Sequence, residues 1–437
     1  MPHAPSPATT YRANRFRLLP NREDERTLRL LGDRVSALWN TANYVCRQAF
    51  LAKHPVAGYT ALCATLRPHE TYAALPSDVA QEVWKQLAEA WRGYGQLRTR
   101  WSAGTLPNKP GLPRYRKHRD GTRPADFIPI KSARSYAIDA HRFALTLPAD
   151  LRQKSGSRLD MSHRGLMRYP GAPGRGELRF DAGRGRWYLH AAVRVAQPVA
   201  RPWPRAAAID LGIRVLVSLC VEDTAAATHY LGREVLKDWD YGGRQISEHM
   251  GELAHRPKGQ RASRKLRRLY PQRRSRWTHA WEALATCVAA DCRRHKIGVV
   301  YLGWPKHIRR ETAYGAKWNG RLHGFWSFDR ASRILEKHLT RCGIQTHRVD
   351  ERGTSSRCPS CASTNVRRYP RHQLTCRACG LQLHSDQAGS RNILRQQKPS
   401  VIWDGAEAAP RPETHRWNRH RWLDASNPSE HSEDRAA

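Results

Sequence analysis

The chain has 437 residues and 40% hydrophobic content, which is enough for two to four packed units and too much for a disordered chain. Its 76 Lys and Arg residues outnumber 38 Asp and Glu residues, giving a formal net charge of +38. A polyanion such as nucleic acid is therefore the expected partner, and a solvated basic surface is the alternative. No apolar run of about 18 residues occurs, so we expect no membrane partner and a cytoplasmic protein that associates with the nucleoid.

The first hundred residues predict a short tail, a strand and a helical region. Residues 1–10 are rich in Pro, Ser and Ala, and we expect them to be disordered. Residues 11–19 alternate basic and apolar side chains, which is typical of a strand. Residues 31–52 and 78–101 carry apolar side chains at spacings of three and four, which predicts two helices.

Residues 102–125 form a loop rich in Gly, Pro, Lys and Arg, with an aromatic residue inside it. Such loops suit phosphate contact and base stacking. The candidate nucleic-acid contacts in this loop are Lys109, Arg114, Tyr115 and Arg116.

The middle of the chain changes from short strands to an α/β pattern. Residues 126–198 contain several short strands, which favour a β-barrel-like unit that includes the first strand. From residue 205 onward, apolar strands alternate with amphipathic helices, which indicates an α/β unit. The strands are expected at 206–209, 215–221, 297–302 and 344–349, and the helices at 275–293 and 326–342.

Basic residues concentrate again between 256 and 276, where ten Lys or Arg residues occur without an acid. We expect this run to contact a nucleic-acid backbone; a solvated basic helix is the alternative. Its candidate contacts are Arg264, Lys265, Arg267, Arg268, Arg273 and Arg274. The residues after 398 lack periodicity and are expected to form a disordered basic tail, or one that orders on RNA.

Four cysteines form two Cys-x-x-Cys pairs, separated by fourteen residues. Two such turns can present four thiolates to one ion, which predicts a closed, structural Zn²⁺ site. Its ligands would be Cys358, Cys361, Cys376 and Cys379.

Asp210 ends the buried strand 206–209, where a carboxylate is costly unless it is paired or bound to metal. Asp386 lies near the start of a predicted helix, after the last cysteine pair, where helix capping is the alternative role. Metal-dependent phosphodiester cleavage needs carboxylates that share a pair of divalent ions. His384 could assist such a site, although a structural role is more common for such a histidine.

The order of these motifs resembles the TnpB transposon proteins and the compact type V CRISPR effectors that look related to them. The specific part is Ala-Ile-Asp210-Leu-Gly, then the two cysteine pairs, then Asp386-x-Ala-Gly-Ser-x-Asn392-Ile. The resemblance covers roughly residues 11–396. It implies a multidomain α+β fold with a wedge-type β-barrel, a helical recognition lobe, and an RNase H-like RuvC nuclease domain into which a four-cysteine zinc ribbon is inserted.

The resemblance also implies domain boundaries and partners. The expected domains are the wedge barrel at 11–30 and 121–200, the helical lobe at 31–120, RuvC at 201–352 and 384–397, the zinc ribbon at 353–383, and the basic tail at 398–437. A guide RNA would pair with the target strand, and the protein would read a short motif in the flanking double-stranded DNA.

One family residue is missing. The family carries a Glu at the end of the central RuvC strand, and Gly303 occupies that position here. Glu351, which follows the strand 344–349, is the best substitute, because ends of neighbouring parallel strands lie about 5 Å apart. Asp350 and Glu311 are weaker candidates. Asp210, Glu351 and Asp386 would then hold two Mg²⁺ ions in an RNA-guided DNA endonuclease.

Other functions stay open at this point. A guided DNA-binding protein without cleavage would also fit the missing Glu. A transposase proper would need a paired-acid core and a recognition domain that the sequence lacks. A plain zinc-ribbon RNA-binding protein would leave Asp210 and its strand unexplained. The sequence does not separate a CRISPR effector from a transposon-borne protein, and it does not give the oligomeric state.

Overall fold

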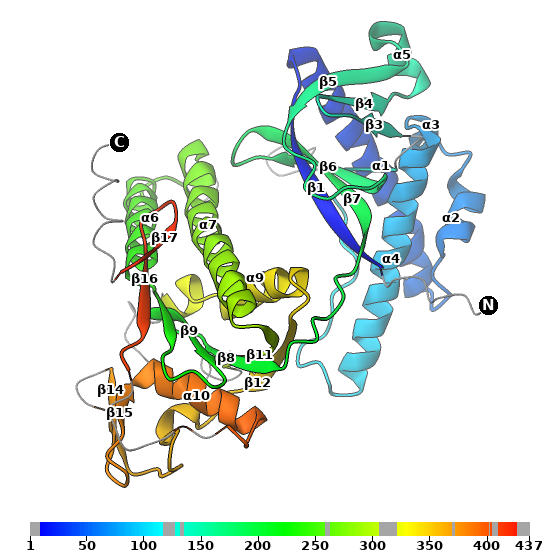
Figure 1. Cartoon of the computed structure of the whole chain (residues 1–437). Helices are drawn as coiled ribbons and strands as arrows, with labels where there is room; N and C mark the ends of the chain where they lie inside the picture. The colour runs from blue at the N-terminus through cyan, green and yellow to red at the C-terminus, as the bar shows by residue number, and fades with distance from the viewer. Residues whose placement is uncertain are drawn as a thin grey trace, which may run out of the picture. The chain divides into compact units, whose positions relative to one another are not determined.

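The computed structural model describes residues 9–116, 127–131, 135–257, 263–305, 321–368, 372–401, 403 and 410–425. The chain divides into two compact units, Met1–Gln197 and Pro198–Ala437 (Figure 1). Among the helices in these ranges, none combines the length and the apolar character that crossing a membrane requires.

The first unit contains a seven-stranded sheet in the order β2-β6-β7-β1-β5-β4-β3, and all its pairings are antiparallel. Its strands are β1 (Thr9–Leu19), β2 (Phe127–Lys131), β3 (Tyr136–Ile138), β4 (Arg142–Thr146), β5 (Arg158–Arg164), β6 (Pro173–Asp181) and β7 (Arg186–Ala196). As the sequence predicts, the first strand joins strands from beyond residue 126, between β7 and β5. Closure of this sheet into a wedge barrel stays a prediction.

The helices of this unit are α1 (Arg22–Leu51), α2 (Tyr59–Leu66), α3 (Glu70–Ala73), α4 (Ser77–Ser102) and α5 (Ala149–Ser155). Helix α1 begins earlier than its apolar periodicity suggests. The Asn21 side chain accepts from the backbone of Glu23 and Asp24, and Asp24 accepts from the backbone of Asn21, which makes a capping box. Helices α1 and α4 pack together, and Trp91 donates to Asn43 at 3.0 Å inside their shared core.

The second unit is built on a seven-stranded sheet in the order β12-β11-β8-β9-β10-β16-β17. Its strands are β8 (Arg205–Asp210), β9 (Val215–Val221), β10 (Thr228–Leu231), β11 (Ile297–Trp304), β12 (Gln345–Asp350), β16 (Glu413–Trp417) and β17 (Trp422–Asp424). Strands β8, β11 and β12 run parallel to one another, which confirms that the strand before Glu351 neighbours the strand carrying Gly303. The expectation that 344–349 is a core strand is wrong, because β12 lies at the sheet edge and its side chains are largely exposed.

Helices cover both faces of this sheet, so its central strands are apolar on both sides. One face packs against α6 (Arg233–Glu252), α7 (Arg264–Arg294) and α9 (Phe328–Arg341), and includes Ala207 and Ile209 of β8. The other face packs against α10 (Ser385–Gln397), and includes Ala206 and Ala208. In Figure 1, α7 and α10 lie on opposite sides of the sheet. A π-helix, η2 (Arg321–Phe325), precedes α9.

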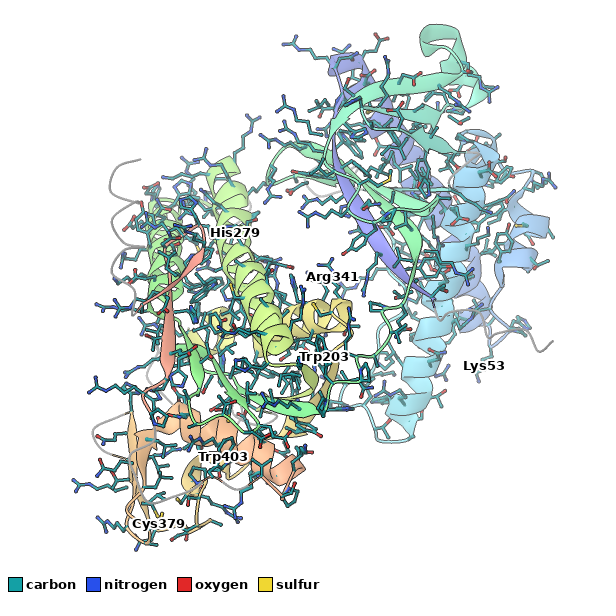
Figure 2. The ribbon with its side chains drawn as sticks, in the orientation of Figure 1. Lys53, Trp203, His279, Arg341, Cys379 and Trp403 are labelled. Atoms are coloured by element: carbon teal, nitrogen blue, oxygen red, sulfur yellow. The ribbon has the colours of Figure 1, made fainter. Side chains whose placement is uncertain are left out.

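The expectation of a disordered tail at 398–437 is wrong for its described residues. Strand β16 pairs in parallel with β10, and β17 pairs with β16. The reason is apolar burial: Trp417 and Trp422 enter the core on the α7 face, and the Trp422 indole donates to the Ala280 carbonyl at 3.1 Å. Trp403 is buried beside α10 on the other face (Figure 2).

A small three-stranded sheet precedes α10. It consists of β13 (Val366–Arg368), β14 (Gln373–Cys376) and β15 (Gln382–His384), in that order and antiparallel. A short 3-10 turn, η3 (Thr354–Ser356), leads into it from β12. Asn392 of α10 donates to the carbonyls of Thr354 and Arg357, which fixes the start of this subdomain against the helix.

Candidate active site and zinc ribbon

Asp210 is the last residue of β8, at the carboxyl end of the parallel strands. Its carboxylate lies against the backbone of Gly389 in α10, so closely that a Cβ at position 389 would collide with Asp210 Oδ2. The small residues Ala388, Gly389 and Ser390 allow this approach, and Ser390 Oγ lies 3.0 Å from Ser218 Oγ of β9. The small-residue turn therefore brings helix α10 onto the end of β8.

Asp386 lies in the first turn of α10 and reaches the same region. The pKa of Asp210 is raised well above its ordinary value, first by burial, then by repulsion from Glu351 and Asp386. Two carboxylates separated by 176 residues in sequence therefore act on each other in the folded chain, as the sequence predicts.

Glu351 reaches the same region, although the strand before it is not a neighbour of β8. Strand β12 neighbours β11 and not β8, so its end lies two strand spacings, about 10 Å, from Asp210. Gly303 of the intervening β11 has no side chain, and a Cβ there would lie 2.6 Å from Glu351 Oε2. The Glu351 carboxylate thus occupies the space above Gly303 that a side chain would fill, next to Ile393 of α10.

The electrostatics of the three acids favour a bound cation. Burial raises the pKa of Glu351 to about 7, with a further contribution from Asp350, and Glu351 Oε2 is buried without a hydrogen-bond partner. Burial also raises the pKa of Asp386. Three partly buried carboxylates, of which Glu351 and Asp386 repel Asp210, are costly unless a cation compensates them.

Oxygen-rich clusters of this kind fit Mg²⁺, which prefers carboxylate and water ligands. In the described part of the chain, the four cysteines are the one group of three or more metal-ligating side chains whose ligand atoms all lie within 4.8 Å of one another. The three acids do not form such a group. Asp350 caps the Arg352 backbone instead, and Glu311 lies outside the described residues.

Sequence reasoning missed the cations beside these acids. The pKa of Asp386 is raised by burial, and His384, His372, Arg368 and Arg214 partly oppose that rise; Arg368 also partly opposes the rise in the pKa of Asp210. Arg214 Nη1 lies 2.6 Å from Nε2 of His372, which belongs to the inserted subdomain. Arg214 follows Asp210 by four residues, so proximity in sequence could have identified it. Arg368 and His372 lie far from Asp210 in sequence, and no local signal marks them.

His384 has a structural position at this site. It caps α10, because its Nδ1 accepts from the Asp386 backbone N–H at 3.2 Å. Its ring stacks on His372 at 5.6 Å and packs edge-on against the buried His229 at 4.7 Å. The cap orients the first turn of the helix, and with it Asp386.

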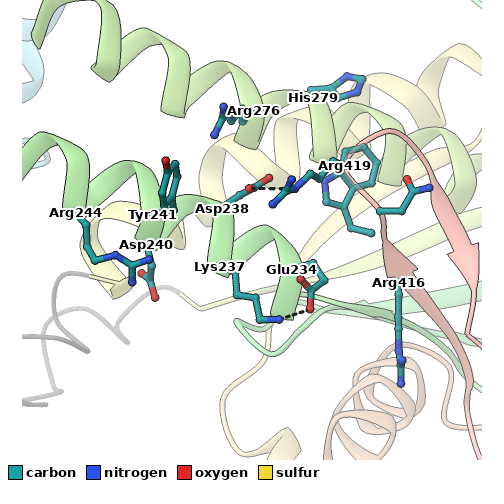
Figure 3. Close-up of a pocket in the computed structure, with 12 residues that line it drawn as sticks. Glu234, Lys237, Asp238, Asp240, Tyr241, Arg244, Arg276, His279, Arg416 and Arg419 are labelled. Atoms are coloured by element: carbon teal, nitrogen blue, oxygen red, sulfur yellow. Dashed lines mark hydrogen bonds and ion pairs between the residues drawn. The ribbon is translucent and has the colours of Figure 1, made fainter. Parts of the chain in front are cut away.

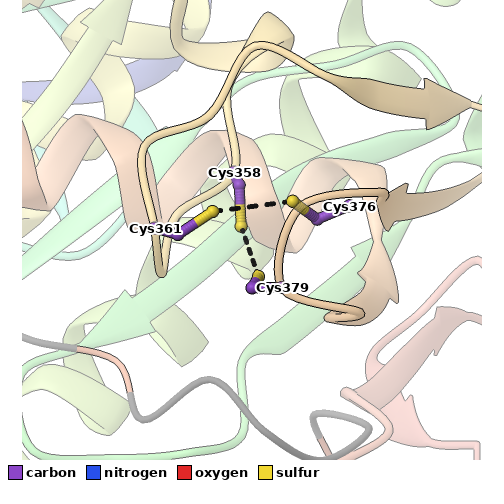
Figure 4. Close-up of side chains that lie close together, drawn as sticks. All are labelled: Cys358, Cys361, Cys376 and Cys379. Carbon is purple, nitrogen blue, oxygen red and sulfur yellow. Dashed lines mark hydrogen bonds between the residues drawn. The ribbon is translucent and has the colours of Figure 1, made fainter.

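The four predicted zinc ligands converge on one point (Figure 4). Cys358 Sγ lies 3.6 Å from Cys379 Sγ, and Cys361 Sγ lies 3.6 Å from Cys376 Sγ. Tetrahedral Zn²⁺ with Zn–S bonds of about 2.3 Å places sulfurs roughly 3.8 Å apart, so the spacing fits zinc. Gly380, at φ +77°, permits the turn of the second knuckle.

The candidate contacts in the first unit have different surroundings. The Arg116 guanidinium lies between the rings of Trp39 at 4.3 Å and Phe127 at 4.7 Å, so it is already engaged within the protein. The Tyr115 ring is covered by Arg47 at 4.6 Å. Lys109 and Arg114 are exposed. Lys109 also lies over the Trp101 ring at 5.4 Å, so contact of these residues with a phosphate stays a prediction.

The basic run of the second unit forms the first half of α7, and residues 258–262 lie outside the described ranges. Arg273 packs over Trp239 at 4.2 Å and is held within the protein. The other five candidates, Arg264, Lys265, Arg267, Arg268 and Arg274, are exposed. A nucleic-acid contact by these five side chains stays a prediction.

Comparison with known proteins gives the same family as the motifs. Residues 190–309 match the OrfB_IS605 family, described as a probable transposase, and residues 328–393 match the Cas12f1-like TNB domain. The TnpB-like protein ORF457 of Acidianus two-tailed virus is 28% identical over 424 residues, covering 90% of this chain and 88% of that protein. The fold is similar to that of a Cas12f1–sgRNA–target DNA complex, at a TM-score of 0.58 and 13% identity over 89% of this chain and 98% of that one.

The matched segments contain the site just described. The OrfB_IS605 match includes β8 with Asp210 and β11 with Gly303, and the TNB match includes Glu351, the four cysteines and Asp386. The class is therefore that of the compact proteins in which a four-cysteine subdomain interrupts an α/β unit. These matches support the resemblance of the chain to TnpB proteins and compact type V effectors.

Proposed function

We propose that the protein is an RNA-guided DNA endonuclease whose carboxylates Asp210, Glu351 and Asp386 hold two Mg²⁺ ions. The observation that carries this proposal is the position of the Glu351 carboxylate above Gly303, facing Asp210 across the intervening strand. The family's usual acid is missing from β11, and a second acid fills the space that its side chain would take.

The side chains have separable roles in this proposal. Asp210 is rigid, because it ends a buried strand and lies against α10. Glu351 is set by the turn after β12, in which Thr354 donates its backbone N–H and its hydroxyl to the Glu351 carbonyl at 3.1 and 2.8 Å. When bound, Mg²⁺ supplies an activated water and stabilises the leaving oxygen. Arg214 and Arg368 are placed to contact the non-bridging oxygens of a phosphate.

The net charge and the fold are the two observations that support guide RNA and target DNA as partners. The net charge of +38 suits a protein that holds nucleic-acid backbones while base pairing reads the sequence. The Cas12f1 complex that shares this fold contains an sgRNA and a target DNA, which supports the same pair of partners here. Zn²⁺ at the four cysteines would be structural, because the closed site leaves no position for water.

The test is single-turnover plasmid cleavage with Mg²⁺, using protein co-purified with its native RNA. We expect Asp210→Ala, Glu351→Ala and Asp386→Ala to abolish cleavage while guided binding persists. Asp350→Ala is the matched control, since it removes the neighbouring acid on the same strand, and Glu311→Ala tests the other candidate. Guided binding by the wild type without any cleavage would replace the nuclease by a nuclease-deficient DNA-binding protein.

A further inference from the structure

A cavity of about 1040 Å³ opens between α6, α7 and the residues of the β16–β17 hairpin (Figure 3). Its polar wall is contributed by Glu234, Lys237, Asp238, Asp240, Tyr241, Arg244, Arg276, His279, Arg416, Asn418 and Arg419. Helices α6 and α7 cover the face of the sheet opposite to α10, which carries Asp386. The cavity is therefore separate from the carboxylate site.

The acids in this wall are neutralised within the protein. Each of the three forms an ion pair with a neighbouring base: Glu234 with Lys237 at 2.9 Å, Asp238 with Arg419 at 3.7 Å and Asp240 with Arg321 at 2.5 Å. Figure 3 shows the first two of these pairs among the residues that line the cavity. The acids thus contribute little net negative charge to a ligand in the cavity.

Three arginines remain available to a ligand. Arg244 of α6, Arg276 of α7 and Arg416 of β16 are exposed and form no ion pair among the described residues. Each comes from a different element, and Figure 3 labels Arg244 and Arg276 on two helices and Arg416 on a strand of the cavity wall. Tyr241, three residues before Arg244 on the same helix, is 47% exposed; the Arg244 guanidinium lies over one face of its ring at 6.0 Å, so the opposite face is the one offered to a base.

We propose that this cavity binds the phosphodiester backbone of a single-stranded polynucleotide. Arg244, Arg276 and Arg416 contact phosphates, since guanidinium groups pair well with phosphate oxygens. Tyr241 stacks on a base, which requires an unpaired base with an open face. The volume of about 1040 Å³ is at the upper end of the roughly 300–1,000 Å³ typical of ligand pockets, and the cavity is open on one side, which suits a chain that passes through it. This site would hold part of the guide RNA or the target DNA of the endonuclease, and that role rests on the proposed function.

The β16–β17 hairpin is essential to this site. Arg416, Asn418 and Arg419 come from it, and pairing of β16 with β10 holds them over α6. A chain that ended at α10 would have neither the third arginine nor this wall. The binding site would then be an open helix surface.

The experiment uses full-length protein freed of nucleic acid at high salt, without guide or Mg²⁺. Fluorescence anisotropy measures binding of labelled oligo(dT) and oligo(U) of equal length, as probes of DNA and RNA. The triple variant R244A/R276A/R416A is compared with a control of equal charge, R142A/R158A/R164A, which removes three exposed arginines from β4 and β5. A second arm crosslinks 5-iodouracil oligonucleotides and identifies the modified residue by mass spectrometry.

We expect the cavity variant to bind at least one probe about tenfold or more weakly at roughly 0.1 M salt, with the slope of log K against log salt reduced by about 2. The control should change by less than about threefold, and Tyr241 should be a crosslinked residue. The probe that loses affinity identifies the source of the strand. Equal losses in both variants, or no crosslink at Tyr241, would overturn the proposal. Because neither arm measures cleavage, a failure here is distinct from a failure of the nuclease assignment.

Discussion

Replacing Gly303 by Ala tests the central feature of the site. An ideal Cβ at this position lies 2.6 Å from Glu351 Oε2, 2.8 Å from Ile393 Cδ1 and 3.2 Å from the Ile209 carbonyl. Real Cβ atoms do not approach other atoms within 3.0 Å, so a neighbour must move. The carboxylate is the most flexible of the three, and we expect it to leave its place above β11. Overpacking of this kind costs about 1–3 kcal/mol, and a misplacement of roughly 1 Å at a reacting centre costs on the order of 100-fold in rate.

The assay is single-turnover plasmid cleavage, with thermal unfolding measured in parallel. The matched control is Gly251→Ala in α6, where nothing lies within 4 Å of an added Cβ. The double variant Gly303→Glu/Glu351→Ala moves the acid onto β11, and we expect it to cleave faster than Glu351→Ala alone. Full cleavage by Gly303→Ala would refute the reasoning, because it would show that the carboxylate above Gly303 takes no part in the reaction.

Three further predictions concern the rest of the second unit and its zinc ribbon. Cys376→Ser should lose the bound zinc and lower the unfolding temperature, whereas Cys63→Ser, outside the ribbon, should retain one zinc ion per chain by elemental analysis. A hydrogen bond from His338 lowers the pKa of Glu282 from its ordinary 4.5 to about 2. The ionised Glu282 therefore stabilises the folded state above pH 4.5, and this contribution is lost as pH falls toward 2. Glu282→Gln should therefore cost about 1 kcal/mol near neutral pH after solvent screening and flatten this acid limb in urea titrations. Trp422→Ala should cost about 3–5 kcal/mol in the same titrations, and a cost near zero would mean that the C-terminal hairpin is not packed.

Local patterns were sufficient for several elements of this chain. The cysteine spacing predicted a site whose four sulfurs do converge, because each knuckle is a local turn and only two turns must meet. The apolar run before Asp210 predicted a buried strand, and β8 is one. The start of α1 was misplaced, because its capping box involves polar residues that carry no apolar periodicity.

Other residues depended on neighbours far away in sequence. The tail beyond 398 was expected to be disordered, because it lacks periodicity, yet its tryptophans complete a sheet whose first strand, β8, begins at Arg205. Arg116 was expected to contact nucleic acid, but its guanidinium lies between two aromatic rings that only the fold brings together.

By itself, the sequence predicted the family, the zinc ligands, and the acids Asp210 and Asp386, because these are read from residue type and spacing. It also showed that Gly303 stands where an acid was expected and that Glu351 follows a neighbouring strand. The tertiary structure decided how Glu351 reaches the site. Strand β11 lies between β12, which precedes Glu351, and β8, which carries Asp210. The Glu351 carboxylate can extend over β11 because Gly303 has no side chain there. This arrangement depends on the order of three strands in the sheet, and that order cannot be read from the spacing of residues along the chain.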